Sequence, residues 1–131
     1  MIFIDTNVFV AYYNKRDIHH ERSLELIKRV IEGYYGKIFT SDYVFDESVT
    51  VTLVRTKDIE KAVALGEYIL NSEIELLSVD ETCFFESWNL FKEIEMSFTD
   101  CTNLSLMKLY GIDKIMTFDR GFRDKGVEVV L

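Results

Sequence analysis

Four acidic residues stand where the sequence pattern predicts the carboxyl ends of strands or the helices that follow them. They are Asp5, Glu47, Asp100 and Asp119. Asp5 directly follows the apolar run 1–4, and Asp119 directly follows the predicted strand 114–118. Asp100 is expected in the first turn of a helix, and Glu47 on a helix face turned toward the core. Because ligands of parallel sheets bind at the carboxyl ends of the strands, we expect the four carboxylates to meet there.

Each acid taken alone also has an ordinary structural explanation. Asp5 and Asp100 could cap or open a helix, where the helix dipole favours a negative charge by about 0.3–1 kcal/mol. Asp119 could form an Asx turn with the residues that follow it. Glu47 could belong to a buried ion pair or extend its carboxylate to solvent. At 100° per residue, however, its neighbours on the helix are apolar: Tyr43, Val44, Val51 and Val54.

The four acids together favour a site for a divalent cation. At an effective dielectric constant of about 20, two carboxylates about 4 Å apart repel each other by about 4 kcal/mol. Such a cluster must raise its pKa values or bind a cation, and Arg120 is the only basic residue next to any of the four in the sequence. Hard oxygen ligands suit Mg²⁺ or Mn²⁺. The pattern therefore predicts metal-assisted phosphoryl chemistry, in which the ion polarises a phosphate and activates water.

The rest of the chain supplies alternating strands and helices that would position these acids. Apolar runs predict strands over 1–4, 37–40, 74–79, 114–118 and 127–130. Helical spacing predicts helices over 8–13, 20–35, 42–56, 58–71, 81–96 and 100–110. Thr6 or Asn7 is expected to cap the first helix, Thr99 is expected to cap the last, and Gly111 is expected to end it. This alternation is typical of an α/β fold with a mostly parallel sheet.

Length and composition limit the class of protein. The chain has 131 residues, 48% of them hydrophobic and 14% aromatic, which fits a single domain over 1–131 and excludes disorder. Its net charge of −8 excludes a globally basic surface for nucleic acid, although not a local basic rim. The chain has no apolar run near the ~18 residues of a membrane span, no basic start typical of a signal peptide, and too few cysteines for a disulfide scaffold. We therefore expect a soluble cytoplasmic protein.

Four segments, in order and in register, resemble the motifs of PIN-domain ribonucleases. The segments are Ile2-Phe3-Ile4-Asp5-Thr6-Asn7, Thr40-Ser41-Asp42-Tyr43-Val44-Phe45-Asp46-Glu47, Ser97-Phe98-Thr99-Asp100 and Thr117-Phe118-Asp119-Arg120-Gly121-Phe122. The resemblance covers essentially the whole chain. It implies a five-stranded, mostly parallel sheet in the order 3-2-1-4-5, flanked by helices, and Mg²⁺- or Mn²⁺-dependent endonucleolytic cleavage of RNA.

The resemblance also implies roles for single residues. Asp5, Glu47 and Asp100 match the three principal metal-binding acids of the family, and Asp119 matches a fourth that varies more. Three further residues match supporting positions of the family: Thr6, Asn7 and Thr117. Asn103 is a further candidate, because it lies on the side of its predicted helix that faces the site. The implied mechanism is direct hydrolysis by metal-activated water. Products would then carry a 5′-phosphate and a 3′-hydroxyl.

The chain looks most like free-standing PIN proteins that act as toxins of type II toxin–antitoxin pairs, the VapC type. That likeness implies a cognate antitoxin and a homodimer, with the helices over 41–71 supplying apolar surface. A PIN ribonuclease of rRNA maturation and a non-catalytic PIN module that binds RNA or protein are the alternatives. A phospho-acceptor receiver domain would need paired acids after the first strand. A haloacid-dehalogenase-type phosphatase would need Asp-x-Asp there, and residue 7 is Asn.

Other residues are less suited to chemistry. Three basic residues near Asp119 are candidates for binding RNA: Arg120, Arg123 and Lys125. His19 and His20 diverge by 100° on a helix, so a solvated helix start is expected rather than a metal pair. Four aromatic residues lie at helical spacing and are expected in the core or on a dimer face, rather than as a platform for stacking bases: Phe84, Phe85, Trp88 and Phe91.

Overall fold

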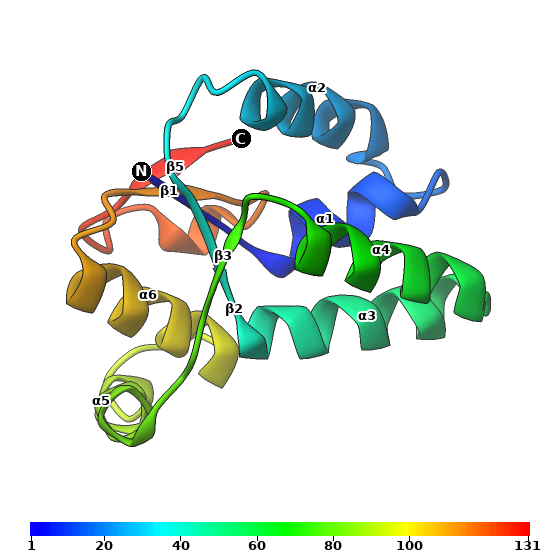
Figure 1. The fold of residues 1–131 in the computed structure, drawn as a ribbon. Coiled ribbons are helices and arrows are strands. Elements are labelled where there is room, and N and C mark those ends of the chain that lie inside the picture. Colours follow the sequence, from blue (N-terminus) through cyan, green and yellow to red (C-terminus); the bar gives the residue numbers. More distant parts are fainter.

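Five parallel strands form one sheet at the centre of the molecule. A computed structural model describes all 131 residues. The strands are β1 (Ile2–Ile4), β2 (Ile38–Ser41), β3 (Glu75–Leu77), β4 (Lys114–Met116) and β5 (Glu128–Val130). Their order is β3-β2-β1-β4-β5 (Figure 1). In register, Ile2 lies opposite Ile38 on one side and Lys114 on the other. The predicted α/β fold and strand order are confirmed.

Six α-helices surround the sheet. They are α1 (Thr6–Tyr13), α2 (His20–Ile31), α3 (Asp42–Thr56), α4 (Ile59–Asn71), α5 (Glu81–Phe91) and α6 (Phe98–Tyr110), with a 3₁₀ turn over Arg120–Phe122. In the view of Figure 1, α2 lies above the sheet, α5 and α6 lie below it, and α3 and α4 form a packed pair to one side. No helix combines the length and the apolar character needed to span a bilayer.

The central strands anchor the core. All three residues of β1 are completely buried, as are Ile115 and Met116 of β4. Helices cover both faces of a parallel sheet, so its central strands bury side chains on both faces. Their residues are therefore apolar in succession rather than in alternation. The loop after β4 is held in turn by Phe122, whose side chain is fully buried. The residues just beyond β1 and β4 therefore project from a rigid scaffold.

Two helix starts differ from the prediction. Asp5, rather than Thr6 or Asn7, caps α1, and its carboxylate accepts a hydrogen bond from the backbone N–H of Thr6. Ser97, rather than Thr99, caps α6, and its hydroxyl accepts from the backbone N–H of Asp100. Side-chain type alone does not reveal which of several candidate residues takes the extended backbone that an N-cap requires.

Two helices also end earlier than predicted. α2 ends at Ile31 instead of residue 35, because Gly33 takes a left-handed conformation with φ of 79° and turns the chain. α5 ends at Phe91 instead of residue 96, and turns occupy the segment that follows. The predicted stop at Gly111 is confirmed, since this residue closes α6 with φ of 67°.

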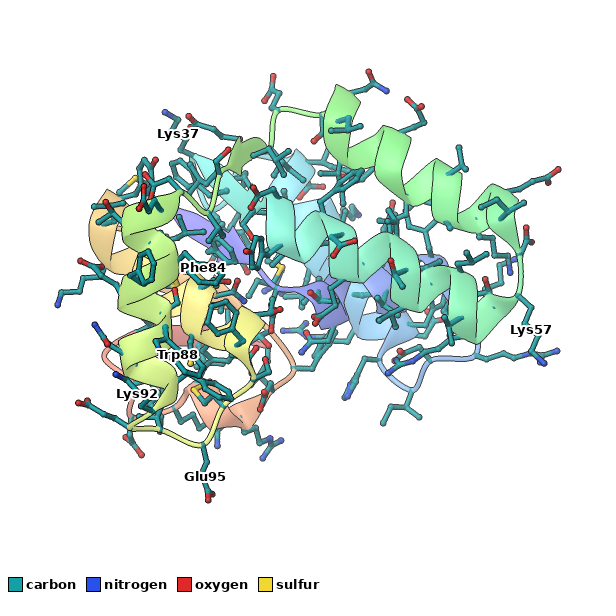
Figure 2. The ribbon with its side chains drawn as sticks, turned by 90° about the horizontal axis from the view of Figure 1, so that it is seen from below. Lys37, Lys57, Phe84, Trp88, Lys92 and Glu95 are labelled. Atoms are coloured by element: carbon teal, nitrogen blue, oxygen red, sulfur yellow. The ribbon has the colours of Figure 1, made fainter.

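The aromatic residues of α5 lie outside the core. Phe84, Phe85, Trp88 and Phe91 are each between 39% and 56% exposed. The rings of Phe84 and Phe85 contact each other, and those of Trp88 and Phe91 stack with centroids 5.8 Å apart. Phe84 and Phe91 also pack against Phe98. Figure 2 shows Phe84 and Trp88 on this helix. Small side chains, Cys83 and Ser87, form the buried face of the helix instead. The expectation that the four aromatic residues belong to the core is wrong, and a dimer face is the reading that stays a prediction.

The buried face of α3 also differs from the prediction. Its buried residues are Val44, Ser48 and Thr52, whereas Val54 is 66% exposed. α3 packs against both α1 and α4, so small side chains between closely approaching helices are buried more completely than a larger valine outside the contact. Glu47 lies half-buried at the edge of this face and not in the core.

Candidate active site

Asp5 is held at the end of β1 by three close hydrogen-bond donors, and the side-chain amide of Asn7 adds a longer contact of 3.5 Å to its Oδ2. Its Oδ1 accepts from the backbone N–H of Thr6 at 2.8 Å and from the side-chain amide of Asn103, on α6, at 3.1 Å. Its Oδ2 accepts from the hydroxyl of Thr117, just after β4, at 2.8 Å. Only 3% of the residue is exposed. Segments distant in the sequence thus orient a single carboxylate.

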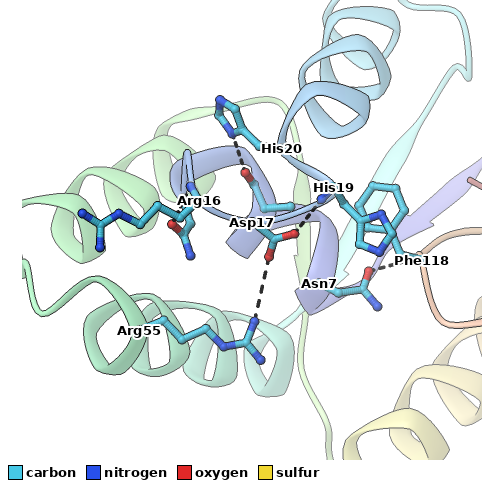
Figure 3. Close-up of polar contacts among 9 residues, drawn as sticks. Asn7, Arg16, Asp17, His19, His20, Arg55 and Phe118 are labelled. Atoms are coloured by element: carbon cyan, nitrogen blue, oxygen red, sulfur yellow. Dashed lines mark hydrogen bonds and ion pairs between the residues drawn. The ribbon is translucent and has the colours of Figure 1, made fainter.

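Thr117 connects Asp5 to the loop that follows β4. Its hydroxyl accepts from the side-chain amide of Asn7 and from the backbone N–H of Asp119, each at 3.0 Å. The Oδ1 of Asn7 in turn accepts from the backbone N–H of Phe118 at 3.0 Å (Figure 3). These bonds tie the loop over 117–119 to the start of α1. The position of Asp119 is therefore coupled to that of Asp5.

The structure brings all four predicted acids around one hollow of about 350 Å³. Asp5 reaches it from the end of β1, Glu47 from α3, Asp100 from the first turn of α6, and Asp119 from the loop after β4. The complete lining consists of Asp5, Thr6, Asn7, Val10, Glu47, Val51, Arg55, Ser97, Asp100 and Asp119. Asp5 is buried and Asp119 is exposed, so the carboxylates extend from the floor of the hollow to its rim.

Burial and mutual repulsion change the acidity of two of these carboxyls. Burial, followed by the negative charges of Asp100 and Glu47, raises the pKa of Asp5 from 3.8 to about 7. Burial, together with the charges of Asp119 and Glu47, raises the pKa of Asp100 from 3.8 to about 6. Near neutral pH, the hollow therefore attracts any cation that relieves this repulsion.

Comparison with known proteins identifies the family. A family model described as the PIN domain matches residues 2–128, nearly the entire chain. The chain belongs to the PIN domain family. The strand order seen here is the order expected from the resemblance to this family.

Individual relatives assign this PIN domain to the VapC type. It is 30% identical to the 23S rRNA-specific endonuclease VapC20 of Mycobacterium tuberculosis over 133 aligned positions, which cover 98% of both chains. The crystal structure of that protein, described as a sarcin-ricin loop cleaving toxin, matches with a TM-score of 0.84 and 26% identity over 97% of this chain and 96% of the other. VapBC2 of Rickettsia felis, bound to promoter DNA, shares the fold with a TM-score of 0.68 and 20% identity over 99% and 98% of the two chains.

The donor set of this PIN domain fits a hard divalent cation. Carboxylate oxygens predominate, and two buried oxygens, Oγ1 of Thr6 and Oδ1 of Asn103, have no hydrogen-bond partner. No three acidic, histidine or cysteine side chains converge closely enough to enclose an ion by themselves. The fit therefore lies in the chemistry of the donors, since Mg²⁺ and Mn²⁺ prefer oxygen ligands and Mg²⁺ keeps several water ligands in proteins.

The basic residues predicted to bind RNA lie outside the hollow. Arg120 and Arg123 are exposed on the loop after Asp119, and neither lines it. Lys125 lines a different depression, between α5 and α6. Of the two histidines, His20 binds the carbonyl of Ala11 through Nδ1 at 2.7 Å, so the two side chains do not form a metal pair.

Two polar residues of the hollow, Ser97 and Arg55, are not among the predicted site residues. The prediction that Thr99 caps α6 hides the role of Ser97. Arg55 is basic, so the pattern of acids that predicts the site does not include it. Its spacing could have revealed it, since Glu47, Val51 and Arg55 are four residues apart on one face of α3 and all three line the hollow.

Proposed function

We propose that this PIN domain is a Mg²⁺- or Mn²⁺-dependent endoribonuclease and the toxin of a type II toxin–antitoxin pair, acting on RNA in the cytoplasm. The observation that carries the proposal is the convergence of four carboxylates, from four separate segments, on one hollow. The names of the relatives support RNA as substrate, because VapC20 of M. tuberculosis is a 23S rRNA-specific endonuclease. Its substrate, the sarcin-ricin loop, is the first RNA to test.

Asp5, Asp100 and Glu47 would hold one or two cations, with Asp119 at the rim helping to hold the second. A bound Mg²⁺ or Mn²⁺ would supply a Lewis acid for the phosphate and lower the pKa of the water bound to it. Asp5 has the most constrained geometry of the four, since three donors orient its two oxygens. Asn103 and Thr117 therefore act as positioning residues for Asp5.

The proposed partners are an antitoxin and a second copy of the chain. The solved structures with the same fold include a toxin–antitoxin complex from Klebsiella pneumoniae, with a TM-score of 0.68 and 16% identity over 100% of this chain and 97% of the other. Apolar residues of α3 and α4, among them Leu53, Ile59 and Val63, are exposed beside a depression between the two helices. This surface and the aromatic face of α5 are the candidates for the homodimer contact.

The test is cleavage of labelled RNAs by the wild type and by Asp100→Asn. A sarcin-ricin loop hairpin and unrelated single-stranded RNAs are incubated with Mn²⁺ or Mg²⁺, and in parallel with EDTA. We expect metal-dependent cleavage by the wild type, none by the variant, and products with 5′-phosphate and 3′-hydroxyl ends. Products with a 2′,3′-cyclic phosphate would contradict direct hydrolysis. No cleavage of any RNA by a folded wild type that binds metal would contradict the proposed enzyme.

Replacing Thr117 by valine should slow cleavage by about 10- to 100-fold, because the partners that orient a metal ligand contribute that much to activity. The change removes the hydroxyl that donates to Asp5 and leaves the amide of Asn7 and the backbone N–H of Asp119 without their acceptor. Single-turnover cleavage at saturating metal measures the effect. Thr117→Ser retains the hydroxyl and should keep most of the activity, so equal losses in the two variants would argue against the hydrogen bond as the cause.

A further inference from the structure

Arg55 is the one positively charged residue among the ten that line the acidic hollow. It lies in the last turn of α3, on the same helix face as Glu47 and Val51. Eight residues separate it from Glu47, which corresponds to about 12 Å along the helix axis. The hollow therefore has its carboxylates at the carboxyl ends of the strands and a single guanidinium at the far end.

Asp17 holds Arg55 on that side of the molecule. Its Oδ2 lies 3.9 Å from Nη1 of Arg55, and its Oδ1 accepts from the backbone N–H of His19 at 2.8 Å (Figure 3). The ring of His19 stacks on Phe118, with centroids 4.2 Å apart. Phe118 is bound to Asn7 in the network around Asp5. The loop that carries Asp17 is thus fastened to the same scaffold as the catalytic carboxylates.

The contact between Asp17 and Arg55 is too long and too exposed to add much to the folding stability of the protein. The Arg55 side chain is 59% exposed, whereas that of Asp17 is only 14% exposed. A separation of 3.9 Å exceeds ordinary hydrogen-bond length, and half-exposed pairs of this kind add little to folding stability. The N–H groups of the Arg55 guanidinium remain available to another acceptor, while the carboxylate of the largely buried Asp17 restricts the direction of the side chain.

We propose that Arg55 binds a backbone phosphate of the RNA strand that enters the hollow, and that Asp17 positions its guanidinium for this contact. The inference rests on the proposed function. A polyanion must pass four carboxylates on a protein of net charge −8, so a phosphate at some distance from the scissile one needs a cation of its own. Arginine suits this role because its planar fork binds phosphate with two hydrogen bonds.

The experiment measures binding of a fluorescein-labelled single-stranded RNA, chosen as one that the wild type cleaves, by fluorescence anisotropy in EDTA, where cleavage does not interfere. Arg55→Ala should weaken binding by about 5- to 20-fold, and Arg55→Lys by less. Asp17→Asn should weaken it by about 2- to 5-fold, because the guanidinium loses its orientation. Arg29→Ala is the matched control, since Arg29 is an exposed arginine on α2 outside the hollow, and it should bind like the wild type.

Two further readouts separate a phosphate contact from a structural role. The slope of log K against log salt should decrease by about 0.7 in Arg55→Ala, the value for one contact to a single strand. With metal present, KM should rise in this variant while kcat changes little, and its thermal midpoint should equal that of the wild type. If the wild type binds and cleaves RNA but Arg55→Ala shows the same affinity and salt slope, this inference fails and the proposed function stands. If the wild type neither binds nor cleaves RNA, both fail.

Discussion

Replacing Asp5 by asparagine should reduce metal-dependent RNA cleavage by at least about 1000-fold, because the buried ligand of the activating cation loses its charge. The same change should make the protein more stable in EDTA at about pH 7.5. In the wild type, the Asp5 carboxylate is ionised at that pH although burial and two neighbouring acids raise its pKa to about 7. A shift of this size, about 3 pKa units, corresponds to at most about 4 kcal/mol of unfavourable free energy.

Asparagine has the shape to occupy the site without that penalty. Its amide oxygen can accept from the backbone N–H of Thr6 and from Asn103, as Oδ1 of Asp5 does. Its amide nitrogen loses the contact with Thr117, because that hydroxyl already accepts from Asn7 and from the backbone N–H of Asp119. The hydroxyl proton of Thr117 can instead turn toward Oδ1 of Asn7, 3.4 Å away. We expect a gain of about 1–3 kcal/mol, or about 3–10 °C in the thermal midpoint.

Calorimetry in EDTA and single-turnover cleavage in Mn²⁺ test the two halves of this prediction on the same preparation. Asp46→Asn is the matched control, because Asp46 is an exposed acid on α3 that does not line the hollow. It should leave both stability and cleavage unchanged. If Asp5→Asn is inactive but less stable than the wild type, the hydrogen bonds of the Asp5 carboxylate stabilise the fold by more than the burial of its charge destabilises it.

The second large effect is a loss of stability as pH rises in the absence of metal. In the folded protein the pKa of Asp5 is about 7 and that of Asp100 about 6, both above the unfolded value of 3.8. The folded state therefore binds more protons than the unfolded state between these limits, and the free energy of unfolding falls with increasing pH. The stability associated with these groups is complete below about pH 4 and is lost as the pH passes through about 6 and 7.

The measurement is a series of thermal melts in EDTA from about pH 5.5 to 8, a range that stays above the pH at which the net charge vanishes. The wild type should lose stability across the range relative to Asp5→Asn, and the difference between the two curves isolates Asp5 from general charge repulsion. Mn²⁺ at about 100 times its Kd should restore about 2.7 kcal/mol at pH 7.5. Parallel curves for the two proteins would show that Asp5 does not titrate in this range, contrary to the prediction.

The sheet and the acids were predictable because they depend on local sequence. β1 is a continuous apolar run and β4 has two apolar residues after Lys114, and each strand is followed by a polar residue. This pattern predicts buried parallel strands and their carboxyl ends. The contact of Asn103 with Asp5 follows from helical spacing, since Asn103 lies one turn after Asp100 on the same side of α6. The resemblance to the PIN family supplied the strand order, which spacing alone could not.

Features that depend on packing between elements were not predictable in the same way. Which face of α3 is buried depends on how closely α1 and α4 approach, and small residues such as Ser48 and Thr52 fill the contact rather than Val54. Gly66 of α4 illustrates the closeness, because a Cβ at this position would lie 3.3 Å from the ring of Phe45. Arg55 meets Asp17 only through the course of a loop that no periodic pattern describes.

The order of the strands has a consequence for the protein while it is being synthesised. β1 is translated first, yet it lies in the middle of the sheet and pairs with β4 over 114–116. Asp5 gains its partners Asn103 and Thr117 only after those late residues have left the ribosome. A nascent chain therefore carries Asp5 without the groups that orient it until residues 103 and 117 have emerged. The ribosome that makes the protein is not exposed to the proposed nuclease activity before that point.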